Sequence, residues 1–493
     1  MPSGFSVIRL ANQDKSVLRS TSQMNSFHST VSRRNFMKAL GLAGAGIGVS
    51  SVSGAVFHDL DEVTSESSEV KHPWWIQEVD NPTLEVDWQA IGKFDARKTV
   101  NGSSTAPYQY AGKEEWDKVL AEAAANFKQW NGENKPGWTL RDYILSRAVG
   151  GASTDFWVGP GKAPTPESLG IPRWEGTPEE NSRMLRSALK LFGASLVGYT
   201  ELNENTRKIL YSWPYNAPFK EYVIEDVDQG YETADKFVIP DRPLWVVSVM
   251  VPCSIENFWT QPSLLGRAAT SNQSRVNTSI ANCAQEFLRG LGYQCLQGSA
   301  NSIAPGPAFS ALSGLGEVCR NTQVINPHYG MLMRNMKMLT DLPLVPTKPI
   351  DAGIWRFCWS CRKCAEVCPS GALSRDTEPS WEIPGAWHNT GKRAFYFDAI
   401  ECQRVRTLFY NECALCMSSC VFTKRDSAMI HEVIKSTVST TSIFNPFFKT
   451  LDDFFGYGTR ADHNPTDGKY NPKSQEWWDL ELPAYGYDLN KPL

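Results

Sequence analysis

The C-terminal third of the chain carries the run Cys358-Trp-Ser-Cys361-Arg-Lys-Cys364-Ala-Glu-Val-Cys368-Pro369. Its spacing, C-x2-C-x2-C-x3-C-P, is typical of proteins that hold a pair of iron–sulfur clusters. A second group follows, with Cys402 ahead of Cys413-x2-Cys416-x3-Cys420. A chain of 493 residues does not need two clusters in order to fold, so their presence indicates electron transfer. We therefore place a ferredoxin-like part with two 4Fe-4S clusters at residues 346–430.

The two groups predict crossed ligation, because the fourth cysteine of such a run serves the other cluster. One cluster would take Cys358, Cys361, Cys364 and Cys420, and the other would take Cys368, Cys402, Cys413 and Cys416. The second group departs from the usual form in two ways. Cys402 stands well upstream of Cys413, and Val421 occupies the place of the closing proline.

Two other uses of these cysteines, a zinc site and a disulfide network, are the alternatives to clusters. Paired C-x2-C units also hold zinc, but two runs of this spacing fit cubane clusters much better. A disulfide network is disfavoured because cysteines this crowded in sequence do not bridge comfortably. Four further cysteines stand outside the runs, and the sequence leaves open whether they form disulfides or stay as buried thiols: Cys253, Cys283, Cys295 and Cys319.

The amino terminus reads as a targeting segment over residues 1–55. Ser32-Arg33-Arg34-Asn35-Phe36-Met37-Lys38 precedes a weakly apolar stretch from Ala39 to Phe57, and a cut after Ala55 would fall among small residues. This is the pattern of a twin-arginine export signal, which is an address and not a membrane anchor. Met24 is a candidate for the true start.

Elsewhere the chain does not indicate a membrane span or a nucleic-acid surface. No other stretch reaches the roughly 18 apolar residues that span a bilayer. The formal net charge of −4 comes without a basic run that would bind a phosphate backbone. We expect no nucleic-acid partner.

Helix and strand signals alternate before the cysteine runs. Thr177-Pro178-Glu179-Glu180 predicts a helix start by the capping-box rule, and Gly193 predicts its end. Further helices are expected at 113–130 and 275–289, strands at 195–199 and 244–251, and a loop at 150–177. This mixture predicts an α/β or α+β core.

A glycine-rich stretch, from Pro305 to Gly316, separates the last of these helices from the cysteine runs. Its Gly-x-Gly is weak support for a nucleotide site. Small residues also let a backbone approach a large flat cofactor, and simple tight turns explain them as well. The 17 tryptophans suggest an apolar pocket or an ordinary core, with four of them as candidates: Trp74, Trp75, Trp477 and Trp478.

The chain resembles the catalytic subunits of corrinoid-dependent reductive dehalogenases from organohalide-respiring anaerobes, most of all the chlorinated-ethene type. The resemblance covers nearly the whole chain in order. Besides the export segment and both cysteine groups, it rests on Trp174-Glu-Gly-Thr-Pro-Glu179, Phe192-Gly-Ala194, Asp341-Leu-Pro-Leu344, Pro349-Ile-Asp351 and Phe455-Gly-Tyr-Gly458.

The resemblance implies a nitroreductase-like core that binds base-off cobalamin, with the two-cluster ferredoxin domain beside it. We place the core at residues 177–345, an N-terminal region covering it at 56–176, and a C-terminal segment packing on it at 431–493. The implied reaction replaces halogen by hydrogen on an organohalide, with a chlorinated alkene or alkane as the expected substrate. Electrons would pass through the two clusters to the corrinoid.

The resemblance also implies two catalytic residues and one departure. Asn301 and Arg334 fall on pocket positions of the family, and Arg334 would stabilise developing negative charge. The family's proton-donating tyrosine falls at Gln273 or Ser274, neither of which is a suitable acid. The proton would then come from another group, such as Tyr329, or from water.

Family members sit on the outer face of the cytoplasmic membrane, held by a small membrane subunit and supplied by an upstream electron donor. The resemblance implies the same peripheral location and partners here. Two other classes share part of the pattern. An exported ferredoxin-type carrier leaves the long core without a purpose, and an epoxyqueuosine-reductase-like enzyme would not need an export signal.

Overall fold

The computed structural model describes residues 72–139, 156–159, 161–169, 172–297, 303–410, 412–423, 429–454 and 472–487. Residues Ser68–Leu493 group into one compact unit. The export segment, the candidate Asn301 and the Phe455–Gly458 match lie outside the described residues.

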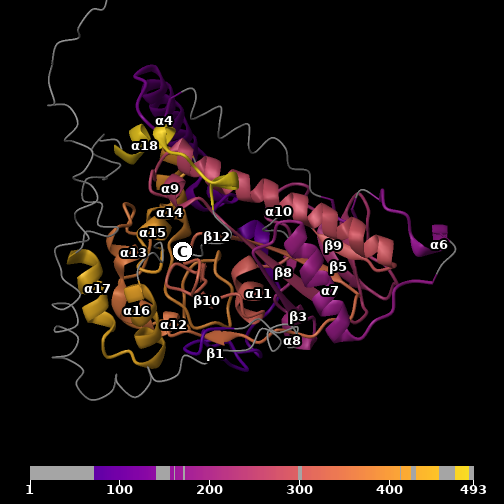
Figure 1. Ribbon diagram of the computed structural model, residues 1–493. Coiled ribbons are helices and arrows are strands. Elements are labelled where there is room, and N and C mark those ends of the chain that lie inside the picture. Colours follow the sequence, from indigo (N-terminus) through magenta and orange to yellow (C-terminus); the bar gives the residue numbers. More distant parts are fainter. Residues whose placement is uncertain are drawn as a thin grey trace, which may run out of the picture. The chain divides into compact units, whose positions relative to one another are not determined.

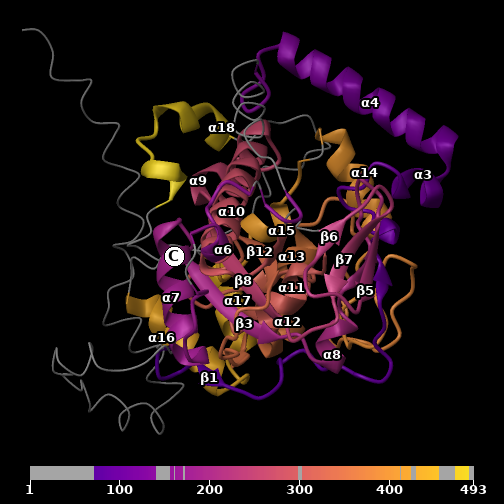
Figure 2. The same ribbon diagram turned by 90° about the vertical axis from the view of Figure 1, so that its right-hand side faces the viewer.

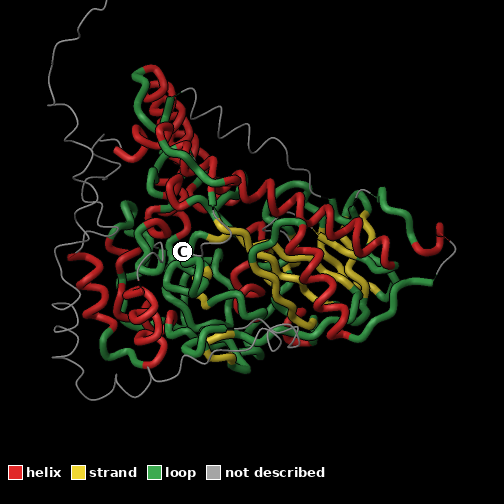
Figure 3. Tube along the Cα trace, in the orientation of Figure 1, coloured by secondary structure: helices red, strands yellow, loops and turns green. Residues whose placement is uncertain are grey.

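A four-stranded antiparallel sheet forms the centre of the core, in the order β3 (Leu196–Glu201), β8 (Trp245–Pro252), β12 (Met333–Thr340) and β9 (Cys295–Gln297). Figure 3 shows these strands gathered behind covering helices. Every residue of β8 after Trp245 is buried, as expected of a strand covered on both faces. The all-antiparallel pairing makes this an α+β core.

Helices cover both faces of this sheet (Figure 1, Figure 2). On one face, α7 (Pro178–Leu191) and α10 (Leu264–Leu291) bury Leu185 and Ile280 against alternate strand residues such as Val249. On the other face, α11 (Gly306–Leu312) contributes Phe309 to a second cluster. Two separate apolar layers therefore hold the sheet in place.

The start of α7 confirms the predicted capping box. The Thr177 side chain accepts from the Glu180 backbone N–H at 3.3 Å, and the Glu180 carboxylate accepts from the Thr177 N–H at 2.9 Å. Pro178 occupies the first turn, and Gly193 follows the helix with φ of 112°. Helix α4 (Lys113–Gly132) also lies where its apolar spacing predicts it.

Helix α10 begins well before the predicted start at Arg275. Ser263 caps it, with its hydroxyl accepting from the Gly266 backbone N–H. The first half carries Arg267, Thr270 and Ser274, which face a cavity described below and not the apolar core. These polar residues hide the helical period there. In the predicted loop 150–177, the described residues include the short helix α6 (Pro166–Leu169).

Shorter elements join the core to the N-terminal region. A small sheet is formed by β5 (Glu221–Glu225), β7 (Lys236–Pro240) and β6 (Tyr231–Glu232). The short helix α8 (Glu204–Arg207) follows β3, and α9 (Ile255–Phe258) follows β8 and contacts α10 and α15. Strand β1 (Gln77–Glu78) pairs with β13 (Ile350–Asp351), and β2 (Phe94–Asp95) pairs with β4 (Tyr211–Trp213). Helices α3 (Ala106–Ala111) and α4 contact α14 (Ala399–Leu408) of the cysteine-rich part.

The cysteine-rich part consists of short helices around its loops. These are α12 (Ile354–Cys361), α13 (Lys363–Glu366), α14 and α15 (Leu415–Ser418), with α13 packed on α15. A hairpin of the core, β10 (Glu317–Val318) and β11 (Val324–Ile325), reaches toward α12.

The C-terminal segment was expected to pack on the core, and the structure divides it. Helices α16 (Met429–Thr440) and α17 (Asn445–Phe454) lie against α12 of the cysteine-rich part. Residues 472–487 lie against the core, where the Asn272 side chain of α10 donates to the Tyr485 carbonyl. Among the described helices, none combines the length and apolar character needed to span a bilayer.

Candidate cluster and cofactor site

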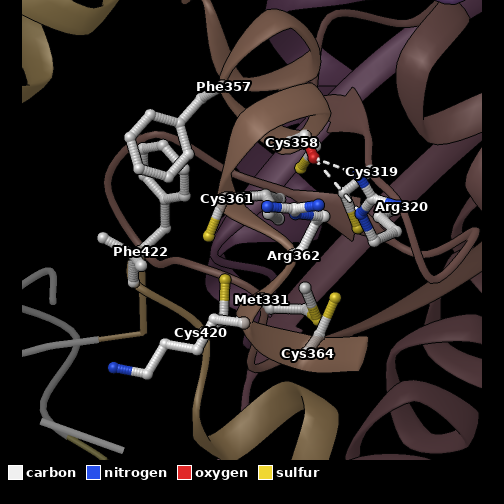
Figure 4. A pocket seen from close by; sticks show the side chains of 13 residues that line it. Cys319, Arg320, Met331, Phe357, Cys358, Cys361, Arg362, Cys364, Cys420 and Phe422 are labelled. Carbon is white, nitrogen blue, oxygen red and sulfur yellow. Dashed lines mark hydrogen bonds between the residues drawn. The ribbon is translucent and has the colours of Figure 1, made fainter. Parts of the chain in front are cut away.

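The structure brings four of the predicted ligands to one small cavity. Its lining includes Cys358 and Cys361 from α12, Cys364 from α13 and Cys420 from the loop after α15. Figure 4 shows these thiols around the cavity, with the rings of Phe357 and Phe422 on one side. These four cysteines are the first predicted crossed set, and the fold brings them to one cavity.

A cation is buried beside this set. Arg320 is 1% exposed, and its guanidinium donates to the Cys358 carbonyl at 2.7 Å and to the Ser374 carbonyl at 2.8 Å. No carboxylate among the described residues lies within salt-bridge distance of it. A buried charge needs a counter-charge. An anionic cluster on the four thiolates would supply one, so Arg320 fits the predicted group.

Cys319 is a fifth thiol in the same cavity. Its single S–H is shared between the Asn321 side-chain oxygen, at 2.9 Å from Sγ, and the Gln323 carbonyl, at 3.1 Å. Burial raises its pKa well above the usual value for cysteine. Cys319 lies outside the C-x2-C-x2-C-x3-C run, and its hydrogen bonds to two oxygen atoms set it apart from the four predicted ligands.

The second crossed set lines a different and much larger cavity: Cys368, Cys402, Cys413 and Cys416. The Asn321 side-chain amide donates to Cys416 Sγ at 3.5 Å, and that of Asn101 approaches Cys402 Sγ at 3.9 Å. Burial raises the pKa of Cys402 to about 12 and that of Cys416 to about 11. A bound metal is what would turn such thiols into thiolates.

The positions of the cysteines also bear on the disulfide and zinc alternatives. All 12 cysteines of the chain are free thiols in the structure. A zinc site requires ligands that meet around one ion. No group of three or more His, Cys, Asp or Glu side chains in the described ranges is arranged in that way.

The large cavity has a volume of about 980 Å³. That is at the upper end of ordinary ligand pockets, which hold drug-sized molecules in about 300–1,000 Å³. Its walls come from three parts of the chain: the N-terminal residues 82–104, the core around the start of β12, and the cysteine-rich part. A cofactor larger than a nucleotide would contact all three.

Arg334 lies in the wall of this cavity, near the start of β12 opposite Val251 of β8. Its Nε is buried and has no hydrogen-bond partner in the described part of the chain. Helix α10 holds the backbone at this position, because the Asn277 side chain donates to the Arg334 carbonyl at 3.3 Å. The predicted residue therefore brings a guanidinium group to the cavity wall, and one of its donors has no protein partner among the described residues.

A buried acid, Glu412, shares this end of the cavity and was not foreseen from the sequence. Its carboxylate accepts from the Gln261 side-chain amide at 2.6 Å. Burial raises the pKa of Glu412, and the charges of Arg406, Arg267 and Arg334 oppose that rise. Only the three-dimensional fold places these three arginines around one acid.

Ser274 lines the cavity where the family tyrosine was expected, and its hydroxyl donates to the Thr270 carbonyl at 3.0 Å. Gln273 is fully buried, with neither side-chain polar atom hydrogen-bonded in the described part of the chain. Tyr329, the suggested substitute, packs with Leu315 and Val324 and is not among the cavity-lining residues. Tyr211 and Tyr215 are the tyrosines that line the cavity.

Two further basic side chains, His388 and Lys392, line the same cavity. Burial and then the charge of Lys392 lower the pKa of His388 to about 4, so the imidazole is neutral. Burial also lowers the pKa of Lys392. No carboxylate of the described residues lies within salt-bridge distance of Lys392, which leaves its ammonium for an anion.

Small residues of α11 form another part of the wall, namely Gly306, Ala308 and Ala311. A Cβ on Gly306 would lie 1.9 Å from the Asn335 side-chain oxygen. The glycine is thus required where α11 meets β12, and the helix backbone can approach a bound group closely. Trp88 and Trp387 line the cavity, whereas none of the four suggested tryptophans does.

Comparison with known proteins gives the family. The family described as "Reductive dehalogenase subunit" matches residues 71–344, more than half of the chain. The chain belongs to this family. A "4Fe-4S binding domain" matches residues 354–374 of the dehalogenase and includes its first cysteine run.

Named relatives agree with this assignment. The trichloroethene reductive dehalogenase of Dehalococcoides mccartyi is 30% identical over 94% of this chain and 99% of its own length. The tetrachloroethene reductive dehalogenase of Sulfurospirillum multivorans is 28% identical over 72% of this chain and 71% of its own. Epoxyqueuosine reductase of Bacillus cereus matches only 13% of this chain and 16% of its own, at 36% identity.

A solved structure supports the fold. The catabolic reductive dehalogenase NpRdhA superposes with a TM-score of 0.55 at 19% identity, covering 83% of this chain. The dehalogenase described here spans about half the length of that structure, 51%. The predicted family, fold class and enzyme class, an oxidoreductase acting on carbon–halogen bonds, are confirmed. The roles of the individual site residues remain predictions.

Proposed function

We propose that this protein replaces halogen by hydrogen on a chlorinated alkene or alkane, as the terminal reductase of organohalide respiration. Electrons pass through two 4Fe-4S clusters to a base-off cobalamin in the large cavity. The relatives named for trichloroethene and tetrachloroethene support this substrate class.

One observation carries the proposal most strongly. The two crossed cysteine sets line two different cavities, and only the second set, with Cys413 and Cys416, shares its cavity with Arg334. This arrangement supports an electron route that runs from the first set to the second set and then into the large cavity. Electrons that leave the second cluster arrive where the substrate would react.

The residues of the large cavity fit a corrinoid. The α11 wall of Gly306 and Ala308 would accept a broad ring system, and Lys392 would hold an anionic group of the cofactor. Bound cobalamin supplies the low-potential cobalt centre for carbon–halogen cleavage. The protein contributes position, electrons and charge.

The net reaction consumes two electrons and one proton and releases a halide ion. Arg334 places a permanent positive charge and a free donor where negative charge develops. Water or another group delivers the proton, because Ser274 is not an acid of suitable strength.

Export and attachment complete the proposal. The Arg33-Arg34 segment supports delivery of the folded protein by the twin-arginine route. The mature enzyme would lie peripherally on the outer face of the cytoplasmic membrane, held by a small membrane-anchor subunit and reduced by an upstream donor of the respiratory chain.

A substrate panel tests the proposal. Anaerobically purified protein, supplied with a strong chemical reductant, should release halide from chlorinated ethenes and ethanes, and less from halogenated phenols. Release that requires an added corrinoid when the cofactor has been removed would support the site. Failure of the corrinoid-loaded protein to release halide from any organohalide would overturn the proposal.

A further inference from the structure

The turn between β10 and β11, residues 319–323, contacts both cysteine sets. Cys319 and Arg320 line the small cavity of the first set. Asn321, Thr322 and Gln323 line the large cavity of the second set. Two consecutive side chains of one turn, Arg320 and Asn321, thus point to two different sets of thiols.

Arg320 is fixed at the first set by four hydrogen bonds. Besides the two donated to the Cys358 carbonyl, it donates to the carbonyls of Ser374 and Trp359. Its guanidinium also lies 3.7 Å from the centroid of the Phe395 ring, which excludes solvent from that side. The charge is therefore shielded from solvent and is screened less at the first set than a surface charge would be.

Asn321 is fixed at the second set by its own hydrogen bonds. Its side-chain oxygen accepts from Cys319 Sγ at 2.9 Å and from the Gln323 backbone N–H at 3.2 Å. Those two donors decide which end of the amide is oxygen. The nitrogen consequently faces sulfur, donating to Cys416 Sγ at 3.5 Å and Met331 Sδ at 3.2 Å.

The hairpin itself is anchored to the first cluster helix. The buried carboxylate of Glu317 accepts from the backbone N–H groups of Ala352 at 2.7 Å and Ile354 at 3.1 Å, where α12 begins. Thr83 donates to the same carboxylate at 2.6 Å. The turn is thus held in register with the helix that carries Cys358.

We propose that this turn tunes the two clusters separately: Arg320 raises the reduction potential of the cluster on Cys358, Cys361, Cys364 and Cys420, and Asn321 raises that of the other. Reduction adds one negative charge to a cluster. A buried cation stabilises that charge, and so does a hydrogen bond to a ligand sulfur. The inference rests on the proposed function, because it requires both clusters.

The test is a redox titration of the anaerobically purified holoenzyme, followed by electron paramagnetic resonance. We would compare Arg320→Gln and Asn321→Ala with the control Arg356→Gln. Arg356 stands close to Cys358 in sequence, but it is exposed and paired with Asp351 at 2.6 Å. Its charge is screened by solvent, so its loss should leave both potentials unchanged.

The expected result is crossed. Arg320→Gln should shift one midpoint potential to a more negative value, Asn321→Ala should shift the other, and each should leave the second midpoint in place. Two unmoved potentials in variants with full iron content, or one midpoint moved by both variants, would overturn the inference.

If Arg320→Gln does not retain iron, Asn321→Ala decides the matter by the same criterion. A wild-type protein without two reducible clusters would instead overturn the proposed function. If the wild type has two reducible clusters but the variants leave both midpoint potentials unchanged, only the role of the turn is contradicted.

Discussion

The two cysteine sets occupy cavities of very different character. The first is small and walled by Phe357, Phe422 and the buried Arg320, whereas the second opens into about 980 Å³ of space. The same ligand chemistry is therefore enclosed in one place and exposed to a cofactor-sized cavity in the other. This difference indicates that a cluster on the first set would pass electrons to the second cluster. The second cluster would deliver them to the group bound in the large cavity.

The strongest test of this difference between the two sets removes one cysteine ligand from each. Cys413→Ala should lower the iron content from about eight to about four atoms and reduce halide release more than about 100-fold, because even supporting residues of metal sites cost 10–100-fold. Cys361→Ala should lose the same amount of iron. With a small reductant that enters the large cavity, it should keep more activity than Cys413→Ala.

Cys283→Ala is the matched control for both variants, since Cys283 is an exposed thiol outside both cavities. Its iron content and activity should equal those of the wild type. Equal loss of activity in Cys361→Ala and Cys413→Ala with every reductant would remove the distinction between the two sets.

Arg334 tests whether a side chain of the large cavity takes part in the reaction. Arg334→Met should lower kcat by about 100-fold at unchanged iron content, which is the usual cost of one transition-state donor. Arg183→Met, on the exposed face of α7, serves as control. Steady-state halide release measures both, and a kcat of Arg334→Met equal to the wild type would exclude the residue from the chemistry.

Lys392 tests whether the same cavity holds an anionic group of the cofactor. Lys392→Met should weaken cobalamin binding by about 10- to 100-fold, because a hydrogen bond to a charged group contributes about 1.5–3 kcal/mol. The exposed Lys348→Met should have no effect. Equilibrium dialysis of cofactor-depleted protein gives the dissociation constants, and identical values for the two variants would contradict an anion site at Lys392.

His388 should give the smallest effect, seen as pH dependence. Its pKa is about 4 in the folded protein, below the usual 6.5, so the unfolded chain binds the proton more readily. Stability is therefore full above pH 6.5 and declines as the pH falls toward 4. Screening at the partly exposed ring limits the loss to about 1 kcal/mol or less. His388→Gln should flatten this dependence in thermal melts, and a curve parallel to the wild type would refute the assignment.

Much of the ligand set could be predicted from the sequence because cysteine spacing is local. Cys358, Cys361 and Cys364 stand on adjacent short helices, so their order along the chain fixes their order in space. Cys420 reaches the same cavity because α15 packs on α13. The capping box at Thr177 and the buried strand β8 were predictable for the same reason, since both depend on neighbouring residues.

Long-range partners left no comparable signal. Arg320 donates hydrogen bonds to the backbone carbonyls of Cys358 and Ser374. Every residue has such a carbonyl, so the sequence does not show which residues Arg320 contacts. Glu412 and Gln261 meet across 151 positions. The polar first half of α10 broke the expected apolar period because it faces the cavity, and sequence periodicity cannot tell a cavity from solvent.

The central claim is that two clusters in series serve a corrinoid held in the large cavity. Metal analysis of oxygen-free, active protein tests it most directly. We expect about eight iron atoms and about one cobalt per chain, with the cobalt in an extractable corrinoid. Protein that releases halide at full rate while containing no corrinoid would contradict it.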